Sequence, residues 1–348
     1  MKRILILGGT GAMGVYLVQL LSNIPSLEVL VTSRSQRQNY GNVKYLLANA
    51  RDPQCMETLL SGNYYDCIVD FMNYNYEEFE QWHLKLLQAT SHYIFLSSSR
   101  VYANSSKPLT EDSPRLLDTT NDKAFLATNR YALRKAREED MLRNSGYVNY
   151  TIIRPYITYS DRRLQLGICE KEDWLYRVLN DKAILFSDNV LDKHTTLTYG
   201  EDVSYGISEL IKRNKPIGGA IHITTNETMT WGSILMLYNN IIKRETGKSI
   251  LIYTSNDIYP LEEIYEGGYN TIYDRQWNRT FSNAKAESLC GHIEYKTMAS
   301  GLTECLTTFI QDWKNFGNSI FLPLNESYHL MSDKMLNDTS IKRSKVIL

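Results

Sequence analysis

The segment NRYALRKAREED, residues 129–140, contains a tyrosine and a lysine four residues apart, Tyr131 and Lys135. The segment has the charged composition of a surface helix, and residues four apart lie on the same face of a helix. The same spacing occurs in YGNVK, but there Tyr40 and Lys44 flank a Gly-Asn turn and precede an expected strand. Only the first pair is therefore predicted to present both side chains to one site.

A serine is the third side chain that suits such a site. The apolar run HYIFLSS, residues 92–98, is predicted to be a strand that ends at Ser98. Residues at the carboxyl ends of parallel strands line the ligand crevice of an α/β sheet. We therefore expect Ser98 to meet Tyr131 beside a cofactor. The alternative is a serine that only caps its own backbone.

The first predicted strand runs directly into a glycine-rich turn, GGTGAMG, in which Gly8, Gly11 and Gly14 are three residues apart. A pyrophosphate can approach such a backbone closely, and the free N–H groups at the start of the next helix favour an anion. This position in a first βαβ unit favours a dinucleotide site over a glycine turn without a ligand.

The end of the second predicted strand bears on the choice of cofactor. An acidic residue there would bind the ribose hydroxyls of NAD, but the sequence VTSRSQR places Ser33 and Arg34 at this point. A hydroxyl and a guanidinium suit a 2′-phosphate. We therefore predict NADP, with NAD as the second choice. The alternative is that Arg34 is only solvated or stacks on the adenine.

Short apolar runs alternate with helical stretches through the first half of the chain. Strands are expected at residues 3–7, 27–33, 42–48, 65–72, 92–98 and 148–155, and helices at 15–24, 53–62, 77–90 and from about 129. Asp52 is the predicted N-cap of the second of these helices, with Pro53 at its first position. The alternation indicates an α/β fold with a doubly wound parallel sheet of the Rossmann type.

The regular alternation fades after residue 155, although AIHITT, residues 220–225, has the pattern of one more sheet strand. We therefore expect a Rossmann domain formed by residues 1–160 and about 192–226. A smaller, interleaved substrate lobe is expected to comprise about residues 161–191 and 227–320, with residues 161–186 rich in helix. Residues 321–348 are expected to form a tail with a polar end, either frayed or in contact with a partner.

The composition of the chain limits the binding partners and the cellular compartment that we expect for it. The formal net charge of −1 gives no reason to expect nucleic acid or an anionic membrane as a partner, and no apolar run reaches the roughly 18 residues of a membrane helix. The five cysteines and six histidines are scattered without metal-binding spacing. We expect a cytoplasmic protein with reduced cysteines and no metal, and with a homodimer as an option for its assembly.

The motifs GGTGAMG, SSSRVYA, YALRK and IIRPYITYS together resemble the extended short-chain dehydrogenase/reductases, in particular the sugar-nucleotide epimerase/dehydratase group. The resemblance is strong over residues 1–160. It is weaker beyond, where TLTYGEDVSYGI and FSNAKAESLCG are similar to later segments of the family. It implies the same Rossmann fold, an NAD(P) cofactor and a nucleotide sugar as substrate.

The resemblance also implies roles for single residues. Tyr131 is the expected acid/base, and Lys135 and a cationic nicotinamide favour its phenolate. Ser98 is expected to bind the reacting oxygen of the substrate. The expected cofactor contacts are Gly8, Thr10, Gly11, Ala12, Met13, Gly14, Ser33, Arg34, Asn49, Ala50, Phe71, Met72, Tyr131, Lys135 and Pro155. The expected substrate contacts are Ser99, Arg100, Thr158, Arg162 and Arg275. The last two are expected from guanidinium chemistry and not from the resemblance, since Arg162, Arg163, Arg275 and Arg279 are all candidates for a substrate diphosphate.

Departures from the family pattern limit the reaction. The 4,6-dehydratases of the family have an Asp-Glu pair directly after the catalytic hydroxyl residue, and this chain has Ser99 and Arg100 there. Asn49 stands where the family places an aspartate near the adenine. The polar segment 104–128 is longer than usual and is expected to be a loop that roofs the site.

These observations lead to a functional hypothesis. We expect an NAD(P)-dependent oxidoreductase that acts on a nucleotide-activated sugar, with net reduction of a 4-keto group by NADPH. The close alternative is a nucleotide-sugar epimerase with tightly bound NAD(P), which would use the same residues. A non-catalytic dinucleotide sensor is disfavoured because Tyr131 and Lys135 are both present.

Overall fold

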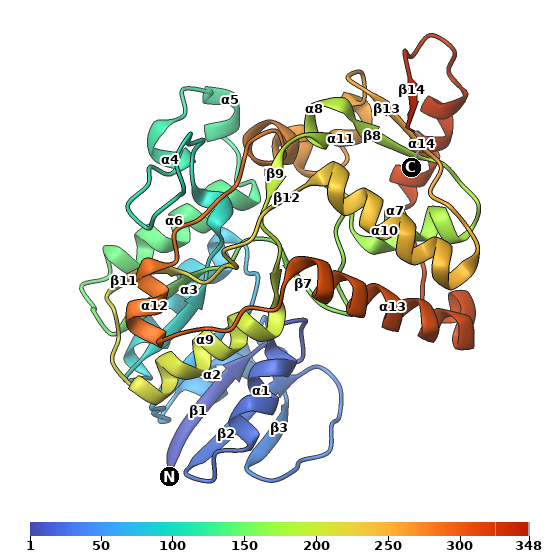
Figure 1. Cartoon of the computed structure of the whole chain (residues 1–348). Helices are drawn as coiled ribbons and strands as arrows, with labels where there is room; N and C mark the ends of the chain where they lie inside the picture. Colours follow the sequence, from blue (N-terminus) through green and yellow to red (C-terminus); the bar gives the residue numbers. More distant parts are fainter. Residues whose placement is uncertain (324, 347–348) are drawn as a thin grey trace.

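A seven-stranded parallel sheet forms the centre of the larger lobe in the computed structural model, which describes residues 1–323 and 325–346 (Figure 1). The strand order is β11-β6-β5-β4-β1-β2-β3. The strands are β1 (Lys2–Leu7), β2 (Leu27–Ser33), β3 (Val43–Leu47), β4 (Cys67–Asp70), β5 (Tyr93–Leu96), β6 (Tyr150–Arg154) and β11 (Gly219–His222). The predicted doubly wound α/β fold is confirmed.

Helices cover both faces of this sheet because successive strand residues point to opposite sides. Ile4 and Ile6 of β1 pack toward α1 (Gly14–Ser22), α9 (Gly200–Arg213) and α12 (Ala284–Cys290). Leu5 and Leu7 pack toward α2 (Pro53–Leu60), α3 (Tyr76–Gln88) and α6 (Tyr131–Arg143). The predicted N-cap of α2 is confirmed, since the Asp52 side chain accepts a hydrogen bond from the Cys55 N–H at 2.8 Å.

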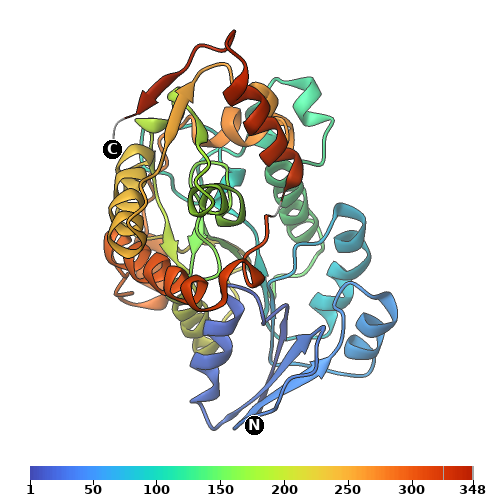
Figure 2. The same cartoon turned by 90° about the vertical axis from the view of Figure 1, so that its right-hand side faces the viewer.

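The smaller lobe lies on the side of the sheet toward which the strands point (Figures 1 and 2). Its three-stranded sheet has the order β14-β13-β8. Its elements are α7 (Lys171–Leu179), β8 (Ile184–Ser187), α8 (Asp188–Leu191), α10 (Trp231–Thr246), β13 (Ile252–Ser255), α11 (Tyr259–Glu262), η2 (Glu266–Gly268), η3 (Thr271–Arg275), α13 (Met298–Phe316), η4 (Gly317–Ser319), α14 (Glu326–Asn337) and β14 (Ser344–Val346).

Short strands lie where the chain passes between the two lobes: β7 (Thr158–Tyr159), β9 (His194–Thr195), β10 (Thr198–Tyr199) and β12 (Met229–Thr230). Three further short helices, η1 (Ser99–Val101), α4 (Leu116–Thr119) and α5 (Lys123–Leu126), lie between β5 and α6 of the large lobe. β7 pairs with β10 in parallel, and β9 pairs with β12 in antiparallel orientation. The chain thus passes between the lobes more than once, which keeps the carboxyl edge of the large sheet next to the small lobe.

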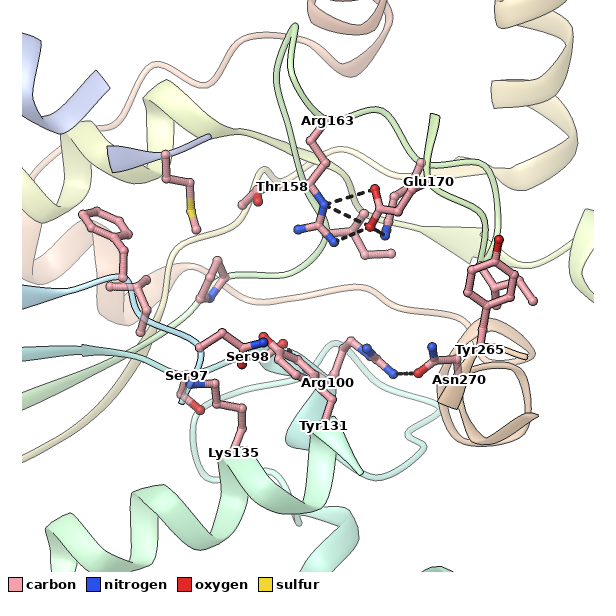
Figure 3. A pocket seen from close by; sticks show the side chains of 18 of the residues that line it. Ser97, Ser98, Arg100, Tyr131, Lys135, Thr158, Arg163, Glu170, Tyr265 and Asn270 are labelled. Atoms are coloured by element: carbon pink, nitrogen blue, oxygen red, sulfur yellow. Dashed lines mark hydrogen bonds and ion pairs between the residues drawn. The ribbon is translucent and has the colours of Figure 1, made fainter. Parts of the chain in front are cut away.

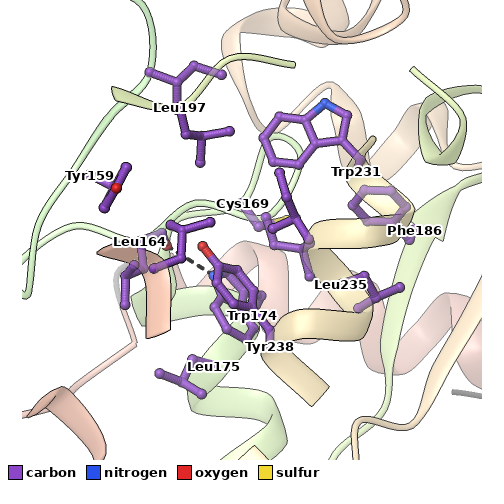
Figure 4. Packing of buried hydrophobic residues seen from close by; sticks show 14 of the residues in the cluster. Tyr159, Leu164, Cys169, Trp174, Leu175, Phe186, Leu197, Trp231, Leu235 and Tyr238 are labelled. Carbon is purple, nitrogen blue, oxygen red and sulfur yellow. Dashed lines mark hydrogen bonds between the residues drawn. The ribbon is translucent and has the colours of Figure 1, made fainter. Parts of the chain in front are cut away.

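The core of the smaller lobe is aromatic. Trp174 on α7 is fully buried, and its ring stacks on Tyr238 of α10 at 4.8 Å between centroids (Figure 4). The indole N–H of Trp174 donates to the Leu164 carbonyl at 3.1 Å, so its polar atom is satisfied inside the core. This aromatic pair therefore holds α7 and α10 together, and Trp174 is a packing residue.

Two expectations for the second half are wrong. Residues 161–186, expected to be rich in helix, contain only α7 and most of β8, because the apolar run ILF pairs with β13. The expected polar tail folds onto the small lobe in its described part. There α14 buries Tyr328, Arg177 donates to the His329 carbonyl at 3.2 Å, and β14 pairs with β13. Residues 324, 347 and 348 of this segment lie outside the described residues.

No helix among the described residues is both long and apolar enough to cross a bilayer.

Candidate active site

A cavity of about 580 Å³ lies between the carboxyl edge of the large sheet and the small lobe (Figure 3). Its volume is within the range of roughly 300–1,000 Å³ that small-molecule sites occupy. Residues from both lobes line it: Met13, Phe71, Met72, Asn73, Leu96, Ser97, Ser98, Arg100, Tyr131, Lys135, Pro155, Ile157, Thr158, Arg163, Gln165, Ile168, Glu170, Ile264, Tyr265, Asn270 and Arg275. Ten of the residues expected from the sequence to form a site are among these.

The structure brings Ser98, Tyr131 and Lys135 to one wall of this cavity (Figure 3). Ser98 follows β5 and caps η1, where its Oγ accepts a hydrogen bond from the Arg100 N–H at 3.2 Å. Tyr131 is the first residue of α6, and Lys135 follows one turn later. The guanidinium groups of Arg100 and Arg134 lie 5.1 and 5.7 Å from the centroid of the Tyr131 ring. Two guanidinium groups therefore lie close to the Tyr131 ring.

Lys135 is buried beside two carboxyl groups that the sequence reasoning did not identify. Its Nζ forms an ion pair with Glu138 at 2.9 Å and lies 4.6 Å from the centroid of the Phe95 ring. Burial raises the pKa of Glu138, and Lys135 counters that effect. Burial also raises the pKa of Asp70, at the end of β4, to about 6. The two carboxyl groups provide countercharge for Lys135 inside the protein.

The glycine turn has the backbone that close approach of an anion requires. Gly8 adopts a φ of +71°, a backbone conformation that residues other than glycine rarely adopt. A Cβ on Gly14 would lie 2.6 Å from the Gly9 Cα, so the start of α1 packs directly on the turn. Thr10, Gly11 and Ala12 complete the turn, and the Gly11 N–H donates to the Gly8 carbonyl at 3.2 Å.

The other expected cofactor residues fall into two groups. Met13, Phe71, Met72 and Pro155 line the cavity next to the turn. Four residues follow or end β2 and β3, outside the cavity lining: Ser33 and Ala50 are buried, and Arg34 and Asn49 are exposed. The Asn49 side-chain oxygen accepts from the Arg51 N–H at 3.2 Å. Arg34 is thus exposed directly after β2 and does not line the cavity.

The structure separates the expected substrate residues. Arg100, Thr158 and Arg275 line the cavity. Ser99 does not, because its side chain is fully buried and its Oγ donates to the Arg154 carbonyl at 2.8 Å. Arg162 does not either, because its guanidinium turns to the glycine turn and donates to the Thr10 carbonyl at 3.4 Å.

Sequence reasoning missed Glu170, Tyr265 and Asn270, which line the cavity from irregular segments of the small lobe, and named Arg163 only as a candidate for a substrate diphosphate. Arg163 and Glu170 form an ion pair at 2.9 Å across the cavity from Ser98 and Tyr131 (Figure 3). Burial raises the pKa of Glu170, but Arg163 and Gln165 outweigh this effect and hold it below its ordinary value. Tyr265 and Asn270 close the far side. Glu170, Tyr265 and Asn270 belong to no periodic pattern or motif that would have marked them.

The prediction that segment 104–128 roofs the site is wrong. None of the described lining residues comes from segment 104–128; the segment 264–275 lies there instead. The Leu109 N–H donates to the Thr280 carbonyl at 2.8 Å, and Arg115 donates to Asp140 of α6 at 2.7 Å. These contacts hold the long segment against the outside of the site.

Comparisons with known proteins agree with this geometry. Residues 4–218 match the sequence model of the NAD dependent epimerase/dehydratase family. A search of curated protein sequences gave no match.

Among the described residues, no group of three or more His, Cys, Asp or Glu side chains could hold a metal ion.

Solved structures with the same fold share only a small fraction of their residues with this chain. The enzyme WbmH from Bordetella bronchiseptica, solved with NAD+, has a TM-score of 0.66 at 14% identity, covering 91% of this chain and all of the other (100%). UDP-glucuronic acid 4-epimerase from Bacillus cereus, with UDP-glucuronic acid and NAD, has 0.64 at 17%, covering 89% and 99%. dTDP-glucose 4,6-dehydratase from Bacillus anthracis, with NAD, has 0.65 at 15%, covering 90% and 98%.

Proposed function

The chain belongs to the NAD-dependent epimerase/dehydratase family, and we propose that it is an NAD(P)-dependent oxidoreductase that acts on a nucleotide-activated sugar. The net reaction we infer is reduction of a 4-keto sugar by NADPH. The observation that carries this proposal is the placement of Ser98, Tyr131 and Lys135 on one cavity wall beside the glycine turn. A sensor without catalysis would have no use for these three groups together.

Each of the three side chains has a distinct part in this reaction. The nicotinamide, when bound, supplies the hydride for the sugar carbon. Tyr131 gives its hydroxyl proton to the oxygen that gains charge, and Ser98 donates a hydrogen bond to the same oxygen. Lys135 holds positive charge one helical turn from Tyr131 and favours the phenolate that remains. The ion pair with Glu138 fixes the direction of the Lys135 side chain.

An epimerase with tightly held NAD(P) is the second candidate, and the bound NAD of the 4-epimerase neighbour favours it. The two reactions differ in whether reduced cofactor is consumed. With a 4-keto nucleotide sugar, net loss of the near-ultraviolet absorbance of NADPH indicates a reductase. Conversion of a nucleotide sugar into its 4-epimer without such loss indicates an epimerase.

Replacing Arg34 with alanine is expected to weaken NADPH binding far more than NADH binding, by about 1.5–3 kcal/mol. The reason is that Arg34, exposed at the end of β2, would lose a charged hydrogen bond to the 2′-phosphate. Calorimetric titration with both cofactors measures the difference. Arg37→Ala is the matched control, because this exposed arginine stacks at 5.8 Å on Tyr45. Equal losses for both cofactors, or tighter NADH binding by the wild type, would contradict NADP specificity.

We expect no loss of water across C5 and C6 of the sugar. That reaction needs a base for the C5 proton and an acid for the leaving hydroxyl. Arg100 keeps its proton near neutral pH, and Ser99 lies outside the cavity. Among the described lining residues only Glu170 carries a carboxyl group, and its lowered pKa keeps it ionised, so it cannot be the acid.

Proton NMR of the reaction in heavy water tests this expectation with a 6-hydroxy nucleotide sugar. A dTDP-glucose 4,6-dehydratase is the positive control. A new C6 methyl signal with deuterium at C5 would show that an acid from elsewhere in the chain performs the elimination.

A further inference from the structure

A buried carboxylate lies behind the wall of the cavity that contains Tyr131. Glu138 on α6 is 0% exposed, and its carboxylate lies 2.9 Å from the Lys135 Nζ and 3.6 Å from the Arg134 Nε. The Arg134 guanidinium is 5.7 Å from the centroid of the Tyr131 ring, and Lys135 follows Tyr131 by one helical turn. Glu138 therefore forms ion pairs with two cations that α6 places beside Tyr131. Because Lys135 and Glu138 are both buried, water screens their charges little.

A second carboxyl group, that of Asp70 at the end of β4, adds to this negative charge. Asp70 is fully buried and accepts hydrogen bonds from the Tyr93 hydroxyl at 2.7 Å and the Met72 N–H at 2.9 Å. Both donors are neutral, so they hold the carboxyl group in place without cancelling its charge. Burial raises the pKa of Asp70 to about 6, which leaves it largely ionised at neutral pH. The ammonium of Lys135 thus acts on two carboxyl groups, those of Asp70 and Glu138.

The surrounding groups leave this balance in place. Charged residues that act on Tyr131 or Glu138 from other directions have ion-pair partners of their own: Arg100 with Asp274 at 3.5 Å, Arg163 with Glu170 at 2.9 Å, and Glu139 with Arg154 at 2.6 Å. Tyr74 lies near Asp70, and burial raises the pKa of Tyr74 well above its ordinary value, so Tyr74 is neutral. A change at Glu138 therefore alters one charge among pairs that stay intact.

The protonation state of Tyr131 before the reaction decides which reaction it can begin. To act as the acid in the reduction of a keto group, Tyr131 must start with its proton. To act as the base in the oxidation of a hydroxyl group, it must start without the proton. A nearby cation favours the phenolate, and a nearby carboxylate favours the neutral hydroxyl. The carboxyl groups beside Lys135 therefore bear on the direction of the reaction.

We propose that Glu138, together with Asp70, offsets the positive charge of Lys135 and Arg134, so that Tyr131 keeps its proton in the resting enzyme. Tyr131 then begins the reaction as an acid. Glu138 is on this basis a positioning residue, which acts on Tyr131 through the two cations. The proposal rests on the proposed function and gives a physical reason for its direction, since an epimerase must first remove a proton from its substrate.

Calorimetric titration of the full chain with NADP+ tests the proposal without any sugar. The phenolate of Tyr131 is favoured when a cationic nicotinamide lies beside it, so binding releases the Tyr131 proton once the pH is high enough. Titrations in two buffers with different enthalpies of ionisation give the number of protons released at each pH. The part of this release that Tyr131→Phe abolishes belongs to Tyr131. We expect this part to be absent at neutral pH in the wild type.

Glu138→Gln removes one negative charge and keeps the size of the side chain. We expect the Tyr131-dependent proton release to move to lower pH by roughly one unit, because Asp70 alone then opposes Lys135 and Arg134. A role of Glu138 only in holding Lys135 predicts the opposite shift, since a displaced Lys135 favours the phenolate less. Glu77→Gln, which removes one charge from an exposed residue of α3, should leave the release unchanged and controls for net charge.

The possible outcomes separate the proposal from the proposed function. Tyr131-dependent proton release at neutral pH in the wild type overturns the proposal alone. The same holds for a release in Glu138→Gln that is unchanged or moves to higher pH. If Glu138→Gln does not fold, Asp70→Asn removes the other carboxyl group, should shift the release in the same direction, and overturns the proposal if it does not. A wild type that binds neither NADP+ nor NAD+ overturns the proposed function as well.

Discussion

Replacing Tyr131 with phenylalanine is expected to lower turnover by at least roughly 100-fold, the usual loss when an acid/base is removed. Cofactor affinity should stay unchanged, because the ring remains at the start of α6 and keeps its contacts with the guanidinium groups of Arg100 and Arg134. Only the hydroxyl that moves the proton is lost. Steady-state kinetics together with calorimetric titration of NADP(H) separate these two effects.

The chain contains a matched control for this variant. Tyr40 is the other tyrosine with a lysine four residues on, but it is 46% exposed and lies just before β3, outside the cavity lining. Tyr40→Phe should leave turnover unchanged. Full turnover of Tyr131→Phe would show that Tyr131 is not the acid/base, whatever the effect on binding.

The second large effect concerns stability and follows from Glu139, which is fully buried on α6. Its carboxylate accepts from Arg154 at 2.8 and 2.6 Å and from Ser97 at 2.6 Å. Glu139→Ala should lower the free energy of unfolding by about 3–5 kcal/mol, because the buried Arg154 is left without its partner. Denaturant unfolding followed by circular dichroism measures this loss. Since Ser97 precedes Ser98, the same contacts stabilise the cavity wall that contains Ser98.

The pH dependence of this contribution has a definite sign. Burial raises the pKa of Glu139, but Arg154, Arg143 and Ser97 outweigh it, and the folded-state pKa is lower than the ordinary value. The stabilisation is therefore present above the unfolded-state pKa and is lost as the pH falls through the folded-state pKa.

The control for the Glu139→Ala measurement is Lys44→Ala, because the ion pair of Lys44 with Glu28 is exposed and should contribute about 0–1 kcal/mol. A loss of less than about 1 kcal/mol for Glu139→Ala would contradict the structural role.

The sequence was a good guide wherever the information is local. The apolar residues 3–7 and the glycine spacing after them predict the succession of β1, the glycine turn and α1. The Asp52 cap is predicted by the aspartate itself and the proline that follows it. The same applies to Tyr131 and Lys135, whose relative position is fixed by the turn of one helix. The strand-end rule then placed Ser98 at the same sheet edge.

Local sequence patterns do not decide which of two neighbouring side chains enters the cavity. Ser98 and Ser99 are neighbours in sequence, but one lines the cavity and the other is buried against Arg154. Arg162 and Arg163 differ in the same way, since only Arg163 faces the cavity. Residue type alone predicted a substrate contact in both pairs. The direction of each side chain depends on the backbone of an irregular segment, which no periodic pattern describes.

What the sequence determined by itself is therefore the parallel sheet, the glycine turn after β1, and the gathering of Ser98, Tyr131 and Lys135 at one edge of that sheet. Only the tertiary structure placed Asp274 against Arg100, Asp70 near Lys135, and Glu170 opposite Tyr131. It also decided that α14 packs on the small lobe. These contacts join residues far apart in the chain, and they form because buried charges and apolar faces are stable only when the folded chain gives them partners. Such partners leave no signature at either position in the sequence, so they become visible only once the chain is folded.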